Sequence, residues 1–132
     1  MKKLHGKTYD CAAGCPVEAT LDLIDGKWKA VILYHLLDDT IRFNELRRRL
    51  SRRITQRMLA RQLRELEASN LIHREIYAEV PPRVEYSLTK LGRSLEPVVR
   101  MLWTWGNQYL EVRASHAGSL GRTASLAQLV EH

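Results

Sequence analysis

Three arginines, a glutamine and an alanine share one face of a helix predicted for residues 54–71, ITQRMLARQLRELEASNL. With about 100° of rotation per residue, these side chains fall between roughly 0° and 140° around the helix axis. They are Gln56, Ala60, Arg64, Arg57 and Arg61. Arginine can bind guanine through two hydrogen bonds, glutamine can bind adenine in the same way, and either can reach phosphate. The pattern therefore predicts a helix that enters a DNA major groove, and an amphipathic helix with a solvated basic face is the alternative.

The same stretch supplies the means of holding such a helix in place. Leu59, Leu63 and Leu66 fall between roughly 280° and 340° around the axis, away from the arginines. This apolar side can pack on the body of a domain. Thr55 is the expected N-cap, and Asn70 is the expected stop, because asparagine tolerates a positive φ.

Charge is concentrated around this helix. The chain has 132 residues, 45% hydrophobic and 27% charged, which fits one globular domain with a formal charge of +6. Between residues 42 and 64 Glu45 is the one carboxylate, and the arginines are Arg42, Arg47, Arg48, Arg49, Arg52, Arg53, Arg57, Arg61 and Arg64. A basic excess permits a polyanionic partner, and guanidinium groups suit forked contacts with phosphate and base edges.

The expected compartment is the cytoplasm. No window approaches the roughly 18 apolar residues that a membrane span needs, and residues 1–14 contain no apolar signal core. No membrane partner is expected. Two cysteines, Cys11 and Cys15, do not make a disulfide scaffold, so reduced thiols are the starting assumption.

The preceding segments predict a helix-turn-helix. Residues 1–14 lack periodicity and are interpreted as a flexible arm, and the ordered domain begins at Cys15-Pro16. Apolar spacing predicts helices over 17–24, 27–37 and 43–50. The polar link 51–53 then joins the third of these helices to the helix of 54–71.

After Asn70 the hydrophobic period changes from helix to strand. Residues 72–77 and 84–88 alternate as two strands, and the loop of 78–83 contains Pro81-Pro82. A hairpin in this place predicts the wing of a winged helix, whose loop residue Arg83 would meet phosphate or a minor groove. A purely structural ribbon is the alternative.

A heptad seam marks the C-terminal helical region, about 89–113, for which Thr89 is the expected N-cap. The seam consists of Leu91, Leu95, Val98, Leu102, Trp105, Tyr109 and Val112. Pro97 should kink or divide the helix near Glu96. Subunit pairing along the seam is predicted, and a helix folded back on its own domain is the alternative. The domain is thus expected over 15–113, followed by a C-terminal tail, 114–132, to which no function is assigned.

Three stretches together resemble the HxlR family of bacterial winged-helix transcription regulators, which are relatives of the MarR group. They are CPVEATLDLIDGKWKAVIL (15–33), RFNELRRRLSRRITQRMLARQLRELEASNLIHRE (42–75) and PPRVEYSLTKLGRSLEPVVRMLWTWG (81–106). The resemblance implies a mainly α fold with a small β-hairpin, a winged helix-turn-helix with N- and C-terminal dimerisation helices. It also implies a homodimer that binds double-stranded operator DNA near promoters, usually as a repressor. Asn70 departs from the family's usual glycine, and the turn Ser51-Arg52-Arg53 is more basic than usual.

We expect the functional residues to divide into two groups. The helix that begins after Thr55 would read bases of a palindromic operator through Gln56, Arg57, Ala60 and Arg61. The DNA backbone would be held by Arg52, Arg53, Arg64 and Arg83.

The resemblance also implies a sensing role for Cys15, since some members of the family respond to quinones, aldehydes or oxidants through a cysteine at this position. A cysteine at a helix N-terminus has a physical reason to react, because the helix dipole favours thiolate. Cys11 could resolve an oxidised Cys15. The alternative is a small structural residue at the dimer interface, in a regulator that is constitutive or responds to a small-molecule effector that no residue cluster marks.

Other function classes fit less well. Cys11 and Cys15 form C-x₃-C rather than the redox C-x-x-C, and the five histidines form no pair at metal-ligand spacing. No phosphate-binding glycine loop or nucleophile elbow is present, so we expect no enzyme, cofactor or metal. RNA is a poorer partner than DNA, because the major groove of A-form RNA is too narrow for a helix.

Overall fold

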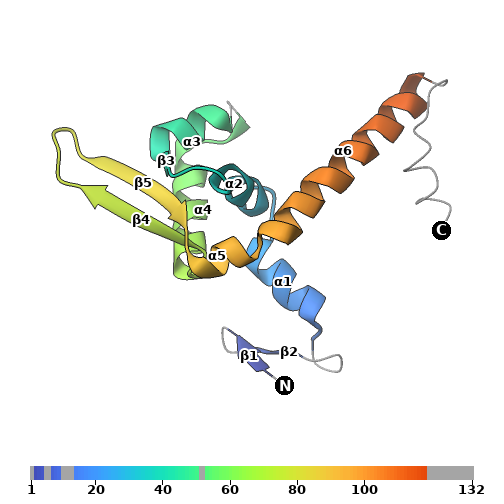
Figure 1. The fold of residues 1–132 in the computed structure, drawn as a ribbon, viewed down its shortest axis with the longest axis horizontal. Coiled ribbons are helices and arrows are strands. Elements are labelled where there is room, and N and C mark those ends of the chain that lie inside the picture. Colours follow the sequence, from blue (N-terminus) through green and yellow to red (C-terminus); the bar gives the residue numbers. More distant parts are fainter. Residues whose placement is uncertain (1, 5–6, 10–13, 51–52, 119–132) are drawn as a thin grey trace. The chain divides into compact units, whose positions relative to one another are not determined.

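A computed structural model describes residues 2–4, 7–9, 14–50 and 53–118 of the chain. The helices are α1 (Pro16–Ile24), α2 (Lys29–Leu36), α3 (Phe43–Arg49), α4 (Gln56–Ala68), α5 (Lys90–Ser94) and α6 (Glu96–Gly118) (Figure 1). The strands are β1 (Lys2–Leu4), β2 (Lys7–Tyr9), β3 (Ile41–Arg42), β4 (Ile72–Tyr77) and β5 (Arg83–Leu88). The chain divides into two compact units after Ser94. The predicted fold class, mainly α with a small β-hairpin in a winged helix-turn-helix, is confirmed.

The core of the first unit lies between α2, α3 and α4. The three leucines of the predicted apolar side of α4, Leu59, Leu63 and Leu66, are all at most 1% exposed. Ile32 of α2 and Leu46 of α3 are fully buried with them. Full burial of one such side chain stabilises a fold by about 1.5–3 kcal/mol, so this side fixes the orientation of α4 and leaves its polar face outward.

Both ends of α4 are formed as the sequence predicts. The Thr55 hydroxyl accepts a hydrogen bond from the Met58 amide at 3.0 Å, as an N-cap does. At the other end Asn70 has a φ of 61°, the left-handed conformation expected of the stop. The Leu71 amide donates to the Leu66 carbonyl and the Asn70 amide to the Glu67 carbonyl, which together form a Schellman motif.

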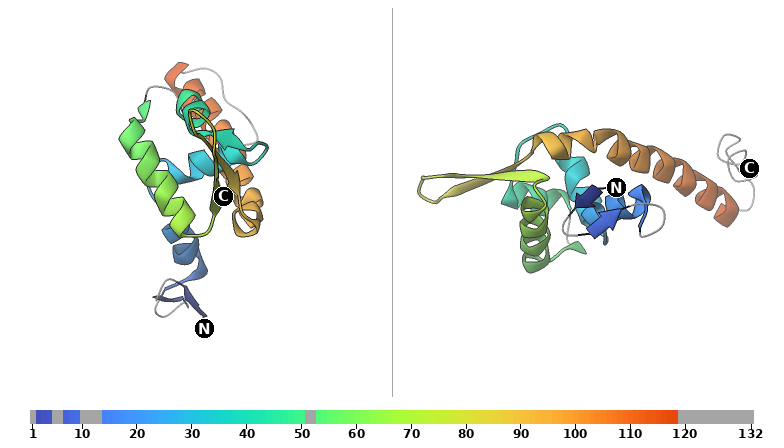
Figure 2. Two further views of the ribbon diagram at one scale, coloured as in Figure 1. Left: turned by 90° about the vertical axis from the view of Figure 1, so that its left-hand side faces the viewer. Right: turned by 90° about the horizontal axis from the view of Figure 1, so that it is seen from below.

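The predicted hairpin is confirmed, and it belongs to a three-stranded antiparallel sheet of order β3-β5-β4. Its register runs from the pair Ile72 and Leu88 to the pair Tyr77 and Arg83. Arg83 therefore begins β5 instead of lying in the loop. The strand β3 was not predicted, because two residues are too few to show an alternating pattern. In Figure 1 and in the right-hand view of Figure 2 the hairpin of β4 and β5 projects beyond α3 and α4.

The N-terminal segment differs from the expected arm without regular structure. Strands β1 and β2 pair antiparallel, with Lys2 opposite Tyr9 and Leu4 opposite Lys7. Each strand has three residues, which is too short for the period-two pattern used to recognise strands.

The C-terminal helical region divides near Glu96, as the position of Pro97 predicted. Helix α5 ends at Ser94 and α6 begins at Glu96, which places Pro97 in the first turn of α6, where proline is tolerated. The Thr89 hydroxyl accepts a hydrogen bond from the Gly92 amide at 3.0 Å, so the predicted N-cap is confirmed. Helix α6 continues to Gly118, beyond the expected end near residue 113. None of the helices in the described part of the chain is long and apolar enough to span a membrane.

Candidate nucleic-acid interface

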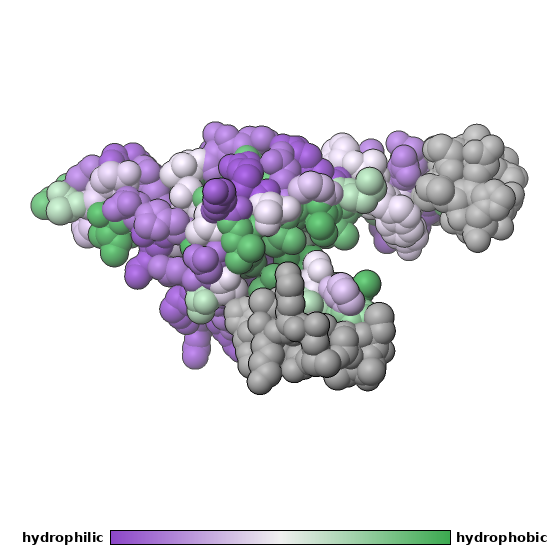
Figure 3. Space-filling view, turned by 60° about the horizontal axis from the view of Figure 1, so that its bottom comes forward, coloured by the Kyte–Doolittle hydropathy of each residue, from purple (hydrophilic) through white to green (hydrophobic). Residues whose placement is uncertain are grey.

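The polar face of α4 is available to a partner. Gln56, Arg57, Arg61 and Arg64 are exposed, and Ala60 between them is half-buried. Figure 3 shows hydrophilic residues over most of α4 and the hairpin. Among the described residues, Arg57 and Arg64 have no ion pair, so their guanidinium groups can bind an anion without first breaking a contact within the protein. This face keeps the composition that the sequence predicted for a helix in a major groove.

Arg61, in contrast, is held by an ion-pair network that reaches α2. Its Nε lies 3.2 Å from Glu65 Oε2, and Glu65 Oε1 lies 2.9 Å from Lys29 Nζ. Lys29 Nζ is also 3.1 Å from Asp25 Oδ1, at the end of α1. The Lys29 side chain is only 11% exposed, so its ammonium depends on the two carboxylates for compensation. The network ties Arg61 to the ends of α1 and α2.

The pKa values of this network favour the charged forms. Burial alone would lower the pKa of Lys29, but hydrogen bonds to Glu65 and Asp25 outweigh it and raise the pKa above its ordinary value. Hydrogen bonds from Lys29 and then Arg61 lower the pKa of Glu65. Sequence analysis missed Lys29 and Glu65 as site residues. The available signal was the spacing of four between Asp25 and Lys29 and between Arg61 and Glu65.

The arginines expected to hold the DNA backbone differ from one another in their surroundings. The Arg53 guanidinium lies 5.9 Å from the centre of the Trp28 ring, a cation–π contact at the approach to α4. Arg52 lies outside the described residues. Arg83 Nη1 is 3.2 Å from Glu79 Oε2, and its guanidinium stands 4.1 Å from the Tyr77 ring centre. Its Nε is buried 3.3 Å from Glu85 Oε2, without hydrogen-bond geometry. Arg83 is thus already compensated within the hairpin.

The arginines of α3 are also partly neutralised. The Glu45 carboxylate accepts hydrogen bonds from Arg48 at 2.7 Å and from Arg49 at 3.0 Å. These hydrogen bonds lower the pKa of Glu45. The net charge of the block between residues 42 and 64 therefore overstates what α3 offers to a polyanion. Among the described residues, α4 contributes two arginines without an ion pair, Arg57 and Arg64, and α3 contributes one, Arg47.

Cys15 occupies the N-cap position of α1. Its φ and ψ are −104° and 165°, its side chain makes no capping hydrogen bond, and its thiol is free. The residue is half-buried, with the Ala19 amide donating to its carbonyl at 3.1 Å. Cys11 lies outside the described residues. Among the described residues, no group of three or more His, Cys, Asp or Glu side chains could hold a metal ion.

The seam residues leave an apolar surface uncovered in the single chain. Leu102, Trp105 and Tyr109 of α6 are 50%, 50% and 44% exposed. The Trp105 and Tyr109 rings stack with centres 5.5 Å apart and planes 7° from parallel. Leu91 of α5 is also exposed, and Leu95 and Val112 are half-buried. Pairing along this seam stays a prediction.

Comparison with known proteins agrees with this arrangement. Residues 23–114 match the model of the HxlR-like helix-turn-helix family. An uncharacterised HTH-type transcriptional regulator of Bacillus subtilis (strain 168), YdeP, is 62% identical over 96 residues, which cover 73% of this chain and 74% of that protein. A second one from the same strain, YybR, is 55% identical over 108 residues, which cover 82% of this chain and 86% of that protein.

Solved structures of regulators are similar throughout the domain. The redox regulator HypR in its reduced form is 56% identical, with a TM-score of 0.70 over 76% of this chain and 98% of that chain. The reduced form of the regulator YodB from B. subtilis is 34% identical, with a TM-score of 0.62 over 74% of this chain and 95% of that chain. The helix-turn-helix, the wing and the similarity to these proteins show that the chain belongs to the HxlR family of transcriptional regulators.

Proposed function

We propose that this regulator binds a palindromic operator as a homodimer, in the cytoplasm, and represses transcription there. The observation that carries the proposal is the exposed polar face of α4, where Arg57 and Arg64 are uncompensated by other described residues. Gln56, Arg57, Ala60 and Arg61 read base edges in the major groove, while Arg64 holds backbone. Arg52 and Arg53 add backbone contacts from the turn, and Arg83 adds one from the wing.

A homodimer is proposed because a palindrome needs two reading helices related by a two-fold axis. The uncovered seam of α6, with Leu102, Trp105 and Tyr109, supplies an apolar surface for the second copy. Burial of these side chains against a second copy would stabilise the dimer by about 25 cal/mol for each Å² of apolar area removed from water.

Capture of genomic DNA fragments on the purified protein tests the proposal. At about 0.15 M salt, non-specific binding to phosphate is suppressed. We expect enrichment of a palindrome with half-sites about 10 base pairs, one helical turn, apart. A recovered library without any common sequence would contradict sequence-specific binding. Repression is then measured with a reporter placed behind the enriched sequence, and activation of that reporter would contradict the repressor assignment.

A second proposal is that Cys15 makes the regulator responsive to oxidants or electrophiles. The free thiol at the start of α1 supports it, as does the similarity to the redox regulator HypR, which has been solved in oxidised and reduced forms. Oxidation by diamide would remove two hydrogens from two thiols as they join. The second thiol would be Cys11 or the partner's Cys15. The alternative is a packing role for Cys15 in a constitutive or ligand-responsive regulator.

The same capture, repeated after diamide treatment, separates these two roles. A sensing Cys15 predicts loss of enrichment in the wild type, recovery with a reductant, and no response in Cys15→Ser. Cys11→Ser is the matched variant, because it shows whether Cys11 supplies the second thiol. Equal enrichment with and without diamide would contradict sensing and leave Cys15 as packing.

A further inference from the structure

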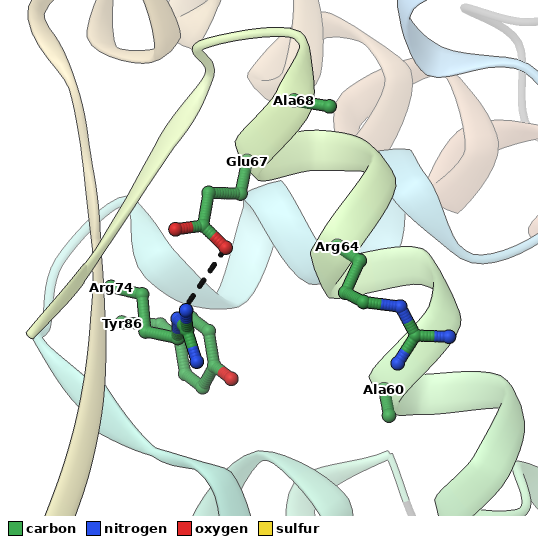
Figure 4. Close-up of a pocket in the computed structure, with 6 residues that line it drawn as sticks. All are labelled: Ala60, Arg64, Glu67, Ala68, Arg74 and Tyr86. Atoms are coloured by element: carbon green, nitrogen blue, oxygen red, sulfur yellow. Dashed lines mark ion pairs between the residues drawn. The ribbon is translucent and has the colours of Figure 1, made fainter. Parts of the chain in front are cut away.

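A pocket of about 520 Å³ lies between α4 and the hairpin. From α4 it is lined by Ala60, Arg64, Glu67 and Ala68, and from the hairpin by Arg74 of β4 and Tyr86 of β5 (Figure 4). Arg74 and Tyr86 are direct cross-strand partners, so their side chains share one face of the hairpin. The two alanines leave the space open. The pocket is therefore built from two elements that the fold holds side by side.

The polar groups of the pocket suit an oxyanion. Arg64 and Arg74 contribute two positive charges against one carboxylate, Glu67. Glu67 Oε1 lies 3.5 Å from Arg74 Nε, which leaves the outer nitrogens of Arg74 as donors. Arginine donates through a planar fork that fits phosphate oxygens. A pocket with this excess of positive charge binds a negatively charged group more strongly than a neutral one.

Tyr86 adds a neutral donor. The residue is only 8% exposed, and Figure 4 shows its hydroxyl directed into the space between Arg74 and α4. Burial raises the pKa of Tyr86, an effect that Glu67 reinforces and the charges of Arg74 and Arg64 oppose. The hydroxyl therefore keeps its proton at neutral pH and can donate it in a hydrogen bond.

The position of the pocket identifies the source of the anion. Ala60 and Arg64 belong both to the polar face of α4 and to the pocket lining. A duplex whose major groove receives α4 must pass one of its strands between that helix and the wing. We propose that this pocket binds a backbone phosphodiester of the operator, through Arg74 and Tyr86 together with Arg64. The inference rests on the proposed function and adds two residues that sequence analysis did not assign to DNA binding.

Substitution of the two hairpin residues tests the pocket. Arg74→Gln should weaken binding about tenfold on operator and random duplex alike. It should reduce the slope of log K against log salt by about 1.8, because each of the two subunits loses one phosphate contact worth about 0.9. Tyr86→Phe, which removes only the hydroxyl, should weaken binding severalfold without changing the slope. Lys90→Gln is the control, because it removes one exposed positive charge outside the pocket. Circular dichroism and thermal unfolding confirm that each variant is folded.

A single neutral methylphosphonate moved along the operator then locates the phosphate. At one position in each half-site the methylphosphonate should weaken binding of the wild type about tenfold, and it should weaken binding of Arg74→Gln markedly less. Independent losses at every position would overturn the proposal. A saturable change in the chemical shift of Arg74 Nε on titration with inorganic phosphate, without coupling between Arg74→Gln and any methylphosphonate, would also overturn the proposal. It would indicate a site for free anions. If no operator is enriched, the proposed function fails, and the salt slope on random duplex still tests the pocket.

Discussion

At the scale of single residues, the ion-pair network around Lys29 determines which contacts Arg61 must give up to bind DNA in the proposed complex. Glu65 accepts both Lys29, at 2.9 Å, and Arg61, at 3.2 Å. A base must compete with Glu65 for Arg61, and Lys29 weakens that competition by sharing the carboxylate. Arg57 has no such competitor among the described residues. The two arginines therefore differ in how much their binding to guanine depends on residues away from α4.

Lys29→Met is expected to lower the free energy of unfolding by about 1 kcal/mol, because Glu65 and Asp25 are exposed enough to return to water. It should also reduce binding to operator severalfold, since Glu65 then holds Arg61 alone. Urea denaturation and operator titration measure the two effects. If Arg61→Ala weakens binding equally in the wild type and in Lys29→Met, the two residues are not coupled.

His35 should make stability depend on pH. Burial, with a smaller effect from the positive charge of Arg49, lowers the pKa of His35 from its ordinary 6.5. Well above pH 6.5 the His35 side chain is neutral in both the folded and the unfolded chain, so it adds no pH dependence to the free energy of unfolding there. As pH falls below 6.5 the unfolded chain takes up the proton first, and the free energy of unfolding falls until the folded pKa is passed.

Urea denaturation at several pH values, with His35→Gln as the comparison, isolates this effect from that of the other histidines. The difference in unfolding free energy between the two proteins should change between pH 6.5 and the lower pKa of the folded state. A difference that stays constant through that range would contradict a lowered pKa.

At the scale of elements, the placement of α4 depends on its two ends as well as its leucines. Thr55 begins the helix, and the φ of 61° at Asn70 turns the chain into β4. The chain then reaches Thr89, whose hydroxyl donates to the Asn70 carbonyl at 2.7 Å and joins the end of α4 to the start of α5. At Gly92 an added Cβ would stand 2.0 Å from the Leu71 carbonyl oxygen, so only glycine allows this approach. The recognition helix, wing and α5 meet at this corner.

The left-handed conformation at the end of α4 predicts that two small substitutions of Asn70 differ in their effect on stability. Asn70→Ala should destabilise the fold by about 1 kcal/mol, because a Cβ without a polar group is strained at positive φ. Asn70→Gly should change stability by less than about 0.5 kcal/mol, since glycine adopts this conformation freely. Thermal and urea unfolding measure both, and equal stability of the two variants would contradict the role assigned to the conformation.

The elements with strong local signals could be predicted from the sequence. Periodicity located α4 by its leucines, and turn chemistry located its ends at Thr55 and Asn70. Strand β3 and the pair β1–β2 could not be predicted, because two or three residues give no measurable alternation. Within the site, the face of α4 was predictable because it is local. Arg74 and Tyr86 were not, because their pocket depends on contacts between elements distant in sequence. Lys29 had a local signal in its spacing of four from Asp25, but its contact with Glu65 had none.

At the scale of the whole molecule, the proposed palindromic operator calls for two copies. Each α4 would read one half-site, and the seam on α6 is the apolar surface through which a second copy would join. The order of helix-turn-helix, wing and long terminal helix was predictable from the sequence and its resemblance to the family. The continuation of α6 to Gly118 was not, because residues 114–118 lack an apolar period.

A charge on the seam should separate the copies. Leu102→Glu places a carboxylate at the centre of the predicted interface, where it cannot be solvated in the dimer. We expect a dimeric wild type and a monomeric variant in sedimentation at micromolar concentration, with loss of operator binding. Thr104→Glu is the control, because Thr104 is exposed on α6 but off the seam. A Leu102→Glu protein that stays dimeric would show that the copies pair elsewhere.

Base reading by the polar face of α4 can be tested by comparing the affinity of the protein for two duplexes. Fluorescence anisotropy at about 0.15 M salt compares the captured operator with a duplex of the same composition in shuffled order. The wild type should prefer the operator by about 10³-fold or more. Arg57→Ala should weaken binding to the operator by about 1–3 kcal/mol, which is roughly 5- to 150-fold in affinity, and should weaken binding to the shuffled duplex less. Equal affinity of the wild type for both duplexes, or equal losses for Arg57→Ala on both, would contradict base reading by α4.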